Sequence, residues 1–320
     1  MRRTIVTHSG RFHADDVLAT VILTILFGET RVERTRDLKR LEAALGDRDT
    51  TVYDVGGVYS PSAGNFDHHM PEGAGTRKNG VSYSSAGLVW KHHGEEALQR
   101  FLDDTENDAD LTFGDLKVLW SRVDEQLVQG IDALDNGACG GRPSVLVEKT
   151  KVWLPSLTGA ISSLNPVVLL EDQSAENFER KFSEACQLMR TVLVQQILEA
   201  ISWVLAKQMV ANGADEDPRV LVLTHDIVWQ EHLFALKMTD VLYVVFPDAE
   251  GTWLVQQVPT EIGAFSGRKP LPESWAGLRS ADLAAVIDIP SAVFCHAGRF
   301  VGGCGTREDA VLMALLAADA

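Results

Sequence analysis

The sequence has few cysteines, and their spacing excludes two classes of site. Cys139, Cys186, Cys295 and Cys304 are spread over 320 residues without a CxxC pair. Such a pattern argues against a disulfide framework and against a zinc site built from thiolates. It favours a reducing compartment.

Basic residues are also in the minority. The chain has 29 lysines and arginines against 45 aspartates and glutamates, which gives a formal net charge of −16. Because proteins that grip long nucleic acids usually present a basic face, this balance disfavours nonspecific duplex binding. It leaves room for a local basic pocket and for carboxylates that bound cations would offset.

Long hydrophobic runs are lacking as well. The run at 17–27 follows Arg2 and Arg3 and superficially resembles a signal peptide, but His and Asp residues precede it and no small-residue cleavage site follows. It is too short to span a bilayer, and no other stretch is expected to do better. We therefore expect a buried helix at 17–27, no membrane partner and a cytoplasmic protein.

Strands and helices alternate in the first 55 residues. Residue patterns predict strands at 4–7, 31–35 and 50–55 and helices at 15–27 and 38–45. This order is typical of a parallel sheet with crossover helices, the hallmark of an α/β fold. Ligands of such sheets bind beyond the carboxyl ends of the strands.

The rest of the chain predicts several helices of the first domain and then a second, smaller α/β domain. We expect helices at 83–102, 116–134, 174–210 and 306–318, an acidic loop at 103–110, and strands at 220–224, 241–246, 252–258 and 293–296. The longest helix, 174–210, could bridge two domains. The pattern changes near 212–218, so the domains are expected at 1–212 and 213–320.

Three segments of the first 70 residues each present a carboxylate, an imidazole or both. They supply His8, His13 and Asp15, with Asp16 a weaker candidate, then Asp54, and then Asp67, His68 and His69. Oxygen and nitrogen ligands suit a divalent transition metal such as manganese better than a structural zinc. His8 and Asp54 fall at the carboxyl ends of expected strands.

The aspartates of the first two segments also have ordinary structural explanations. Asp15 or Asp16 could simply cap the helix that follows, and Asp54 could be a turn residue before Gly56-Gly57. The adjacent triplet at 67–69 is harder to explain, because three such side chains are costly to bury without a partner.

Asp132 and Asp135 end the helix expected at 116–134. Residues three apart lie on one helical face, so both carboxylates could point the same way. Carboxylates at a helix C-terminus oppose the helix dipole, which a metal ion would offset. The alternative is solvated surface charge.

A second cluster lies near the C-terminus. It consists of His296, Arg299, Gly302 and Gly303 before the last helix, and of Arg268 and Lys269 upstream. Glycines allow close approach, helix N-termini bind anions, and arginine makes bidentate phosphate contacts. These residues predict a small phosphate pocket, with a glycine turn before an amphipathic helix as the alternative.

Taken in order, these segments resemble the melanocyte-proliferating-gene family of the DHH phosphoesterase superfamily. The matching segments are 7–16, 53–57, 66–69, 83–88, 131–137, 268–272 and 296–303, which span almost the whole chain. One departure is His13, where most of the superfamily has aspartate.

The resemblance implies a catalytic domain that binds two metal ions, expected to be Mn²⁺, with Mg²⁺, Co²⁺ or Zn²⁺ as alternatives. His8, His13 and Asp15 would hold one ion or share both, Asp54 would bridge and Asp67 would be a ligand. His68 or His69 would bind metal or contact the leaving phosphate, and Asp132 or Asp135 would complete the set. The catalytic residues would then be Asp67, His68 and His69.

The resemblance also implies a hydrolase that cleaves phosphodiester bonds in RNA, oligonucleotides or small nucleotides, in the manner of a 3′–5′ exonuclease. Two ions roughly 3.5–4 Å apart would activate a water. The alternatives are a pyrophosphatase-like phosphoanhydride hydrolase and a non-catalytic nucleotide-binding module. A homodimer is compatible with the sequence. A protease is disfavoured, since neither HExxH nor a nucleophile elbow occurs.

Overall fold

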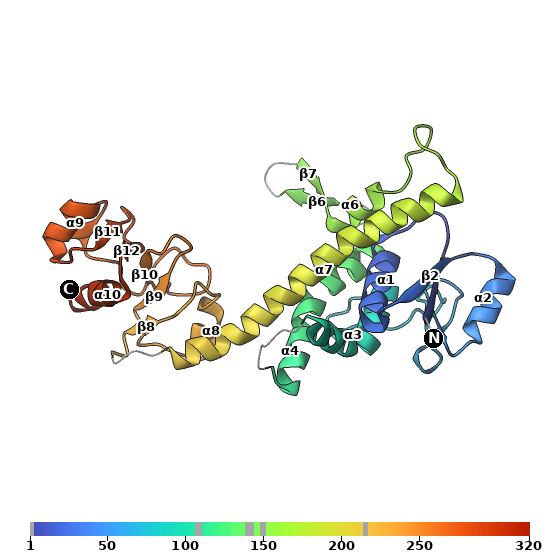
Figure 1. Ribbon diagram of the computed structural model, residues 1–320, viewed down its shortest axis with the longest axis horizontal. Helices are drawn as coiled ribbons and strands as arrows, with labels where there is room; N and C mark the ends of the chain where they lie inside the picture. The colour runs from blue at the N-terminus through green and yellow to red at the C-terminus, as the bar shows by residue number, and fades with distance from the viewer. Residues whose placement is uncertain (1–2, 106–110, 138–143, 148–151, 214–216) are drawn as a thin grey trace. The chain divides into compact units, whose positions relative to one another are not determined.

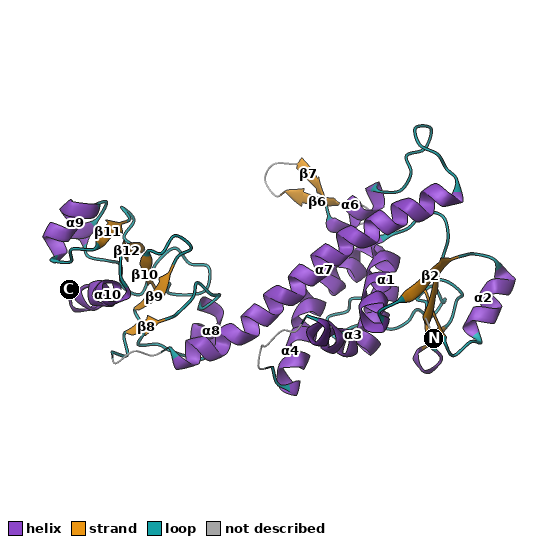
Figure 2. Cartoon of the chain, in the orientation of Figure 1, coloured by secondary structure: helices purple, strands orange, loops and turns teal. Residues whose placement is uncertain are grey.

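The chain is a mixed α/β protein, as expected, and its described residues include two five-stranded sheets. The computed structural model describes residues 3–105, 111–137, 144–147, 152–213 and 217–320, traced in Figure 1 and coloured by element in Figure 2. Two compact units divide the chain, Met1–Ala200 and Ile201–Ala320. Cys139 and residues 214–216 of the expected boundary lie outside the described residues.

The sheet of the first unit has the strand order β2-β1-β3-β5-β4. Its strands are β1 (Arg3–Thr7), β2 (Thr30–Arg34), β3 (Thr50–Tyr53), β4 (Tyr59–Ser60) and β5 (Asn65–Phe66). Strands β1, β2, β3 and β5 run parallel, which confirms the expected parallel sheet, and β4 pairs antiparallel to β5. Sequence patterns missed β4 and β5, because two residues are too few to show a period.

Helices α1 (Ala14–Phe27) and α2 (Leu38–Leu45) connect the first three strands. Every residue of α1 from Ala14 to Leu23 is buried, and the helix packs against α3 (Ser85–Asp104). A helix that is apolar on all sides must lie inside the fold, which explains the hydrophobic run noted in the sequence. Because α3 continues to Asp104, the acidic loop expected at 103–110 starts after that residue. Residues 106–110 of the loop lie outside the described part.

The helix expected at 116–134 is interrupted. Helix α4 (Phe113–Val123) passes into a π-helical turn (Asp124–Val128) and then into α5 (Gln129–Asp135). The backbone N–H of Gln129 donates to the carbonyl of Asp124, five residues earlier. A single π turn changes the apolar period too little to be read from sequence, and such turns often occur at functional sites.

The first unit continues with a hairpin and two helices. The hairpin consists of β6 (Ser144–Val147) and β7 (Val152–Pro155), followed by α6 (Leu157–Ser163) and α7 (Ala175–Asn212). The division between the two units falls within α7, and its role as a domain linker stays a prediction. By length and composition alone α7 could cross a membrane, so the expectation that no stretch qualifies is wrong in that respect.

The sheet of the second unit has the order β11-β12-β10-β9-β8. Its strands are β8 (Val220–Val222), β9 (Tyr243–Pro247), β10 (Trp253–Gln257), β11 (Ala292–Cys295) and β12 (Val301–Cys304), and its helices are α8 (Gln230–Ala235), α9 (Ser280–Ile287) and α10 (Arg307–Asp319). Alternate residues of β9 enter two cores. Tyr243 and Val245 join the core that includes Met313 of α10, while Val244 and Phe246 join the one that includes Leu233 of α8.

Candidate metal centre

Three neighbouring parallel strands end in potential metal ligands. His8 follows β1, Asp54 follows β3 and Asp67 follows β5, and these strands are adjacent in the order β1-β3-β5. All three residues are buried. Asp54 has a positive φ of 55°, a conformation that few residues other than glycine adopt and that often marks a functional position.

The first turn of α1 adds further carboxylates to the same edge. Asp15 and Asp16 are both buried, and Asp16 Oδ1 accepts a hydrogen bond from the backbone N–H of His13 at 2.9 Å. Asp16 thus caps the helix, as its alternative explanation proposes. Its other oxygen, Oδ2, lies 3.4 Å from His8 Nε2. One side chain therefore has both a structural contact and a place in the cluster.

The imidazole and carboxylate atoms converge on Asp54. His8 Nε2 lies 3.2 Å from Asp54 Oδ2, and His68 Nε2 lies 3.4 Å from Asp54 Oδ1. His68 Nε2 is also 3.4 Å from Asp135 Oδ2 and 3.8 Å from Asp15 Oδ2. Each oxygen of Asp54 thus faces a different histidine, as a carboxylate that bridges two ligand sets would.

Four overlapping triads have one ligand atom per residue within 4.8 Å of each other. The triads are His8-His13-Asp54, Asp54-His68-His69, His13-Asp15-Asp135 and Asp15-Asp16-Asp54. Asp54 belongs to three of them. Mixed nitrogen and oxygen donors of this kind fit a divalent transition metal.

Several donor atoms of this cluster lack a conventional hydrogen bond. His8 Nε2, both oxygens of Asp15, Asp16 Oδ2 and His68 Nε2 are buried without such a partner among the described residues. Buried polar atoms normally have partners, because leaving them unsatisfied costs free energy. Donors that are buried, converging and unsatisfied are what a metal site requires, so these residues fit the metal implied by the sequence.

The pKa values of the carboxylic acids in the cluster are shifted in different directions: those of Asp15 and Asp16 are raised, and that of Asp54 is lowered. Burial, together with the charges of Asp54 and Asp135, raises the pKa of Asp15 well above its usual value, and burial raises that of Asp16 to about 7. Burial also acts to raise the pKa of Asp54, but His68 and His8 outweigh it, so that pKa falls. Of Asp15, Asp16 and Asp54, only Asp54 has its ionised form favoured by these surroundings.

The pKa values of the histidines are also shifted in different directions: those of His8 and His69 are raised, and that of His13 is lowered. Burial acts to lower the pKa of His8, but Asp54 and Asp16 outweigh it and raise the pKa. Burial lowers the pKa of His13. A hydrogen bond to Asp67 raises the pKa of His69, although burial opposes it.

The DHH triplet, residues 67–69, is held by hydrogen bonds to the carboxylate of Asp67. Asp67 Oδ2 accepts from the N–H of Gly57 at 2.6 Å, and Oδ1 accepts from the N–H groups of His68 and His69 at 2.7 and 3.1 Å. The His68 side chain is 8% exposed and faces the carboxylates, while the His69 side chain is 61% exposed and its Nδ1 lies 2.7 Å from Asp67. Asp67 is in none of the four triads, so its role as a ligand stays a prediction.

Asp132 and Asp135 occupy different environments. Asp135 approaches His68 and belongs to a triad, as described above. Asp132 accepts hydrogen bonds from Ser84 and Gly87 and pairs with Arg77. The structure thus brings Asp135 to the cluster and places Asp132 behind it, a choice that the sequence left open.

Sequence reasoning missed two further contacts of the site. Ser85 Oγ donates to Asp54 Oδ1 at 3.2 Å, and Arg77 joins the carboxylates of Asp124 and Asp132. Ser85 lies in one of the segments that carry the family resemblance, a signal that could have found it. Arg77 has no such signal, because its partners are about 50 residues away.

Two of the residues expected to bind substrate in the second unit, Arg268 and Lys269, donate hydrogen bonds to backbone carbonyls. Arg268 Nη1 donates to the carbonyls of Met238 and Val241 at 2.7 Å each, and Lys269 Nζ donates to that of Ala318 at 2.8 Å. These cations therefore hold the fold of the second unit. Their role in substrate binding stays a prediction.

His296 and Arg299 lie in the turn between β11 and β12. The His296 side chain is exposed, and its Nδ1 accepts from the N–H of Gly298 at 2.9 Å. Arg299 has a positive φ of 60°, and its Nη1 makes a long 3.4 Å contact with the carbonyl of Leu271. Both side chains remain available for a ligand, and such binding stays a prediction.

The expected glycine loop is a strand. Gly302 and Gly303 lie in β12, and a Cβ on Gly303 would come within 2.9 Å of the Phe294 ring. Close packing therefore explains this glycine. The helix N-terminus that follows is capped by Thr306 and carries Glu308 and Asp309 in its first turn, so it is not a free anion site.

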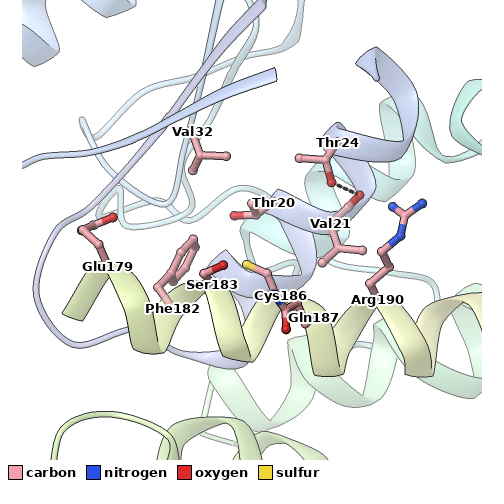
Figure 3. Close-up of a pocket in the computed structure, with 10 residues that line it drawn as sticks. All are labelled: Thr20, Val21, Thr24, Val32, Glu179, Phe182, Ser183, Cys186, Gln187 and Arg190. Carbon is pink, nitrogen blue, oxygen red and sulfur yellow. Dashed lines mark hydrogen bonds between the residues drawn. The ribbon is translucent and has the colours of Figure 1, made fainter. Parts of the chain in front are cut away.

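A cavity of about 280 Å³ lies between α1 and α7 (Figure 3). Its lining residues are Thr20, Val21, Thr24, Val32, Glu179, Phe182, Ser183, Cys186, Gln187 and Arg190. None of them is a donor of the metal cluster. Thr20 touches the site indirectly, since its Oγ1 donates to the carbonyl of Asp16 and lies 2.6 Å from the hydroxyl of Tyr53.

Two solved structures resemble the chain weakly. The pGpG-specific phosphodiesterase PggH of Vibrio cholerae is 14% identical over 100% of both chains, with a TM-score of 0.25. RecJ of Thermus thermophilus in complex with Mn²⁺ is 14% identical over 99% of this chain and 52% of its own, with a TM-score of 0.25. Scores this low carry no argument about this chain.

Sequence comparison is decisive. The model of the MYG1 exonuclease family, described as "Uncharacterised protein family (UPF0160)", matches residues 4–318. A MYG1 protein of Saccharomyces cerevisiae is 33% identical over 96% of this chain and 93% of its own length. The MYG1 exonuclease of Bos taurus is 32% identical over 96% and 82%. The expected family resemblance is confirmed, and the chain belongs to the MYG1 family.

Proposed function

We propose that this protein is a metal-dependent phosphoesterase that hydrolyses phosphodiester bonds in RNA, oligonucleotides or small nucleotides. The observation that carries the proposal is the set of four overlapping donor triads, three of which share Asp54, and the unsatisfied buried atoms among them. Relatives that bear the name MYG1 exonuclease support an exonuclease-like mode of action. The proposal rests on the chemistry of the donors and not on fold likeness.

Two divalent ions, manganese in the first place, would when bound polarise the phosphate and lower the pKa of a water to near neutrality. His8, His13 and Asp15 would hold one ion and His68 and Asp135 the other, and Asp54 would be shared, since its two oxygens face His8 and His68. His8, Asp15 and Asp54 are buried among these donors, which keeps bulk water away from them and strengthens their charge interactions.

His69 is placed for a different task from His68. Its side chain is exposed, and its hydrogen bond to Asp67 raises its pKa although burial opposes the rise, which favours the protonated form. A protonated imidazole beside the site can bind the phosphate or donate to the leaving oxygen. Asp67 would then act as a ligand and as the group that orients His69.

The remainder of the substrate would bind in the second unit. Arg299 and His296 lie in one turn beside Gly302-Gly303; Arg299 makes one long contact with the carbonyl of Leu271, and the exposed His296 ring lies 4.4 Å from that of Phe300. A guanidinium and an imidazole together suit a phosphate that does not react. Arg268 and Lys269 would contribute less, because backbone carbonyls already engage their charged groups.

The test is hydrolysis of short single-stranded RNA by wild type and Asp54→Asn, with Mn²⁺, Mg²⁺, Co²⁺ or Zn²⁺ added to chelator-treated protein. We expect Mn²⁺-dependent release of nucleotides and a loss above about 100-fold in Asp54→Asn, more than supporting residues of metal sites usually cost. Asp103→Asn on the exposed surface of α3 is the matched control and should keep full activity. Equal activity of the two variants would refute the mechanism.

The same assay separates the alternatives. Turnover of pyrophosphate in place of RNA would identify a phosphoanhydride hydrolase, which needs the same ions and a differently shaped pocket. Nucleotide binding without turnover in any of the four metals would identify a binding module. Labelling RNA at either end gives the polarity of cleavage.

A further inference from the structure

Arg77 lies in a loop between the DHH triplet and α3, away from the metal donors. Its backbone is fixed in a turn, with its N–H donating to the carbonyl of Val81 at 2.8 Å and its carbonyl accepting from Gly80 at 3.0 Å. The side chain is only 7% exposed. A buried arginine must have its charge and donors satisfied, so its partners define its role.

The guanidinium of Arg77 joins two carboxylates from different helical segments. Nε and Nη2 donate to the two oxygens of Asp124 at 3.2 and 2.6 Å, and Nη1 donates to Asp132 Oδ2. The ring of Tyr83 lies beneath the guanidinium, 4.2 Å from its central carbon. Bidentate pairing of this kind fixes orientation as well as distance.

Asp124, which pairs with Arg77, is the first residue of the π-helical turn. Gln129 follows this turn, and its side-chain amide donates to Asp124 Oδ2 at 2.8 Å. Arg77 thus connects the loop after the triplet to the π turn and to α5 at once.

Asp132 continues the connection to α3. It is fully buried, and its Oδ1 accepts from Ser84 N–H at 3.1 Å, from Ser84 Oγ at 2.6 Å and from Gly87 N–H at 3.1 Å. Ser84 makes no capping hydrogen bond with its own side chain, so Asp132 caps α3 from another helix. A Cβ on Gly87 would clash with this carboxylate.

Both helices that Asp132 joins carry a contact of the metal cluster. On α5, Asp135 follows one turn later and places Oδ2 3.4 Å from His68 Nε2. On α3, Ser85 follows Ser84 and donates to Asp54 Oδ1 at 3.2 Å. Movement of Asp132 would therefore displace two groups of the site together.

We propose that Arg77 is a positioning residue for the metal centre, acting through Asp132 to hold Asp135 and Ser85 against the other donors. This inference rests on the proposed function, since it assumes that the cluster binds metal. Residues that orient metal ligands from outside commonly change metal affinity by 10–100-fold when replaced. Arg77 is such a residue by its contacts, although no motif in the sequence marks it.

Two variants disturb the same link by independent means. Arg77→Met removes the guanidinium, and Gly87→Ala inserts a methyl group against the Asp132 carboxylate without touching Arg77. Gly130→Ala on α5 is the matched control, because a Cβ there meets nothing within 4 Å. Arg77→Lys keeps the charge but cannot pair bidentately, so it should fall between wild type and Arg77→Met.

The readout is the affinity of chelator-treated protein for Mn²⁺, measured by calorimetry well below each variant's Tm and without substrate. We expect Arg77→Met and Gly87→Ala to bind Mn²⁺ at least tenfold more weakly, Arg77→Lys to lose less, and Gly130→Ala to match wild type. Wild-type affinity in folded Arg77→Lys and Gly87→Ala would overturn the inference, even if their Tm fell. That result would assign the link to stability alone.

The inference and the proposed function can fail separately. Wild-type protein that binds Mn²⁺ but hydrolyses no diester, pyrophosphate or nucleotide would refute the proposed function, and the affinities would still decide the role of Arg77. Wild-type protein that binds no Mn²⁺ would refute both. Wild-type Mn²⁺ affinity in folded Arg77→Lys and Gly87→Ala, together with full diester hydrolysis by the wild-type protein, would refute only the role of Arg77.

Discussion

The metal-donor edge of the first unit and the basic residues of the second unit were both predicted as parts of the site, yet their polar atoms have different partners. At the donor edge, His8, Asp15 and His68 have buried atoms without hydrogen-bond partners among the described residues. In the second unit, backbone carbonyls satisfy Arg268 and Lys269. Unsatisfied buried donors are destabilising, so the first region is shaped for a ligand and part of the second for folding.

Helix α5 contains both a residue of the donor cluster, Asp135, and a residue with satisfied hydrogen bonds, Asp132. Replacing these two residues should give the largest changes in activity and stability. Replacing Asp135 by Asn removes a charged donor that faces His68. We expect RNA hydrolysis in Mn²⁺ to fall by more than about 100-fold. Since burial and the charge of Asp54 raise the pKa of Asp135, the metal-free protein should keep or raise its Tm. Activity assays and calorimetry in chelator measure the two effects.

Asp132→Asn, in contrast, should lower the stability of the metal-free protein. Asp132 is fully buried and pairs with Arg77, and breaking a buried pair costs about 3 kcal/mol or more. The free energy of unfolding in chelator should therefore fall clearly in Asp132→Asn and not in Asp135→Asn. Equal stability of the two variants would contradict the assignment of one aspartate to the site and the other to its support.

The positions of the strand ends could be predicted, but the choice between these aspartates could not. His8 and Asp54 follow apolar β-rich segments, and parallel strands bring such ends together whatever the details. Asp132 and Asp135 share a helical face at a spacing of three. What separates them is Arg77, which reaches Asp132 from a loop 55 residues away, and one-dimensional periodicity contains no such information.

Glycines in the second unit illustrate the same limit. A run of glycines before a helix predicted a phosphate-binding loop, but Gly302 and Gly303 pair in β12 with β10 and β11. The β-strand pattern was hidden because glycine has no side chain to alternate. Contacts with Phe294, eight or nine residues earlier, account for small side chains there.

The two arginines of the second unit should separate folding from binding. Arg268→Met loses hydrogen bonds to backbone carbonyls and should destabilise the protein by about 2 kcal/mol, with KM for RNA changed little. Arg299→Met, which loses one long contact, should raise KM several-fold and change stability by less than about 0.5 kcal/mol. Denaturant unfolding and steady-state kinetics test the pair, and exchanged effects would reverse the roles.

The smallest expected effect is the pH dependence of the metal-free donor edge. Asp16 has a pKa raised to about 7 by burial, although the charge of His8 opposes the rise. Between about pH 4 and 7 the native state therefore holds a proton that the unfolded chain has lost, and stability falls as pH rises. His8 acts in the same direction, since the stability from its raised pKa is lost as pH rises through that value. His13, whose pKa is lowered, opposes the trend.

Each proton held in this way changes the free energy of unfolding by at most about 1.4 kcal/mol per pH unit. In chelator we expect Tm to fall from pH 5 to pH 7, and less steeply in Asp16→Asn. Saturating Mn²⁺ should reverse the trend, because binding requires deprotonated donors and displaces those protons. A metal-free Tm that rises over this range would show that the buried carboxylates are already ionised, and that the contrast between the two regions does not arise from unsatisfied donors.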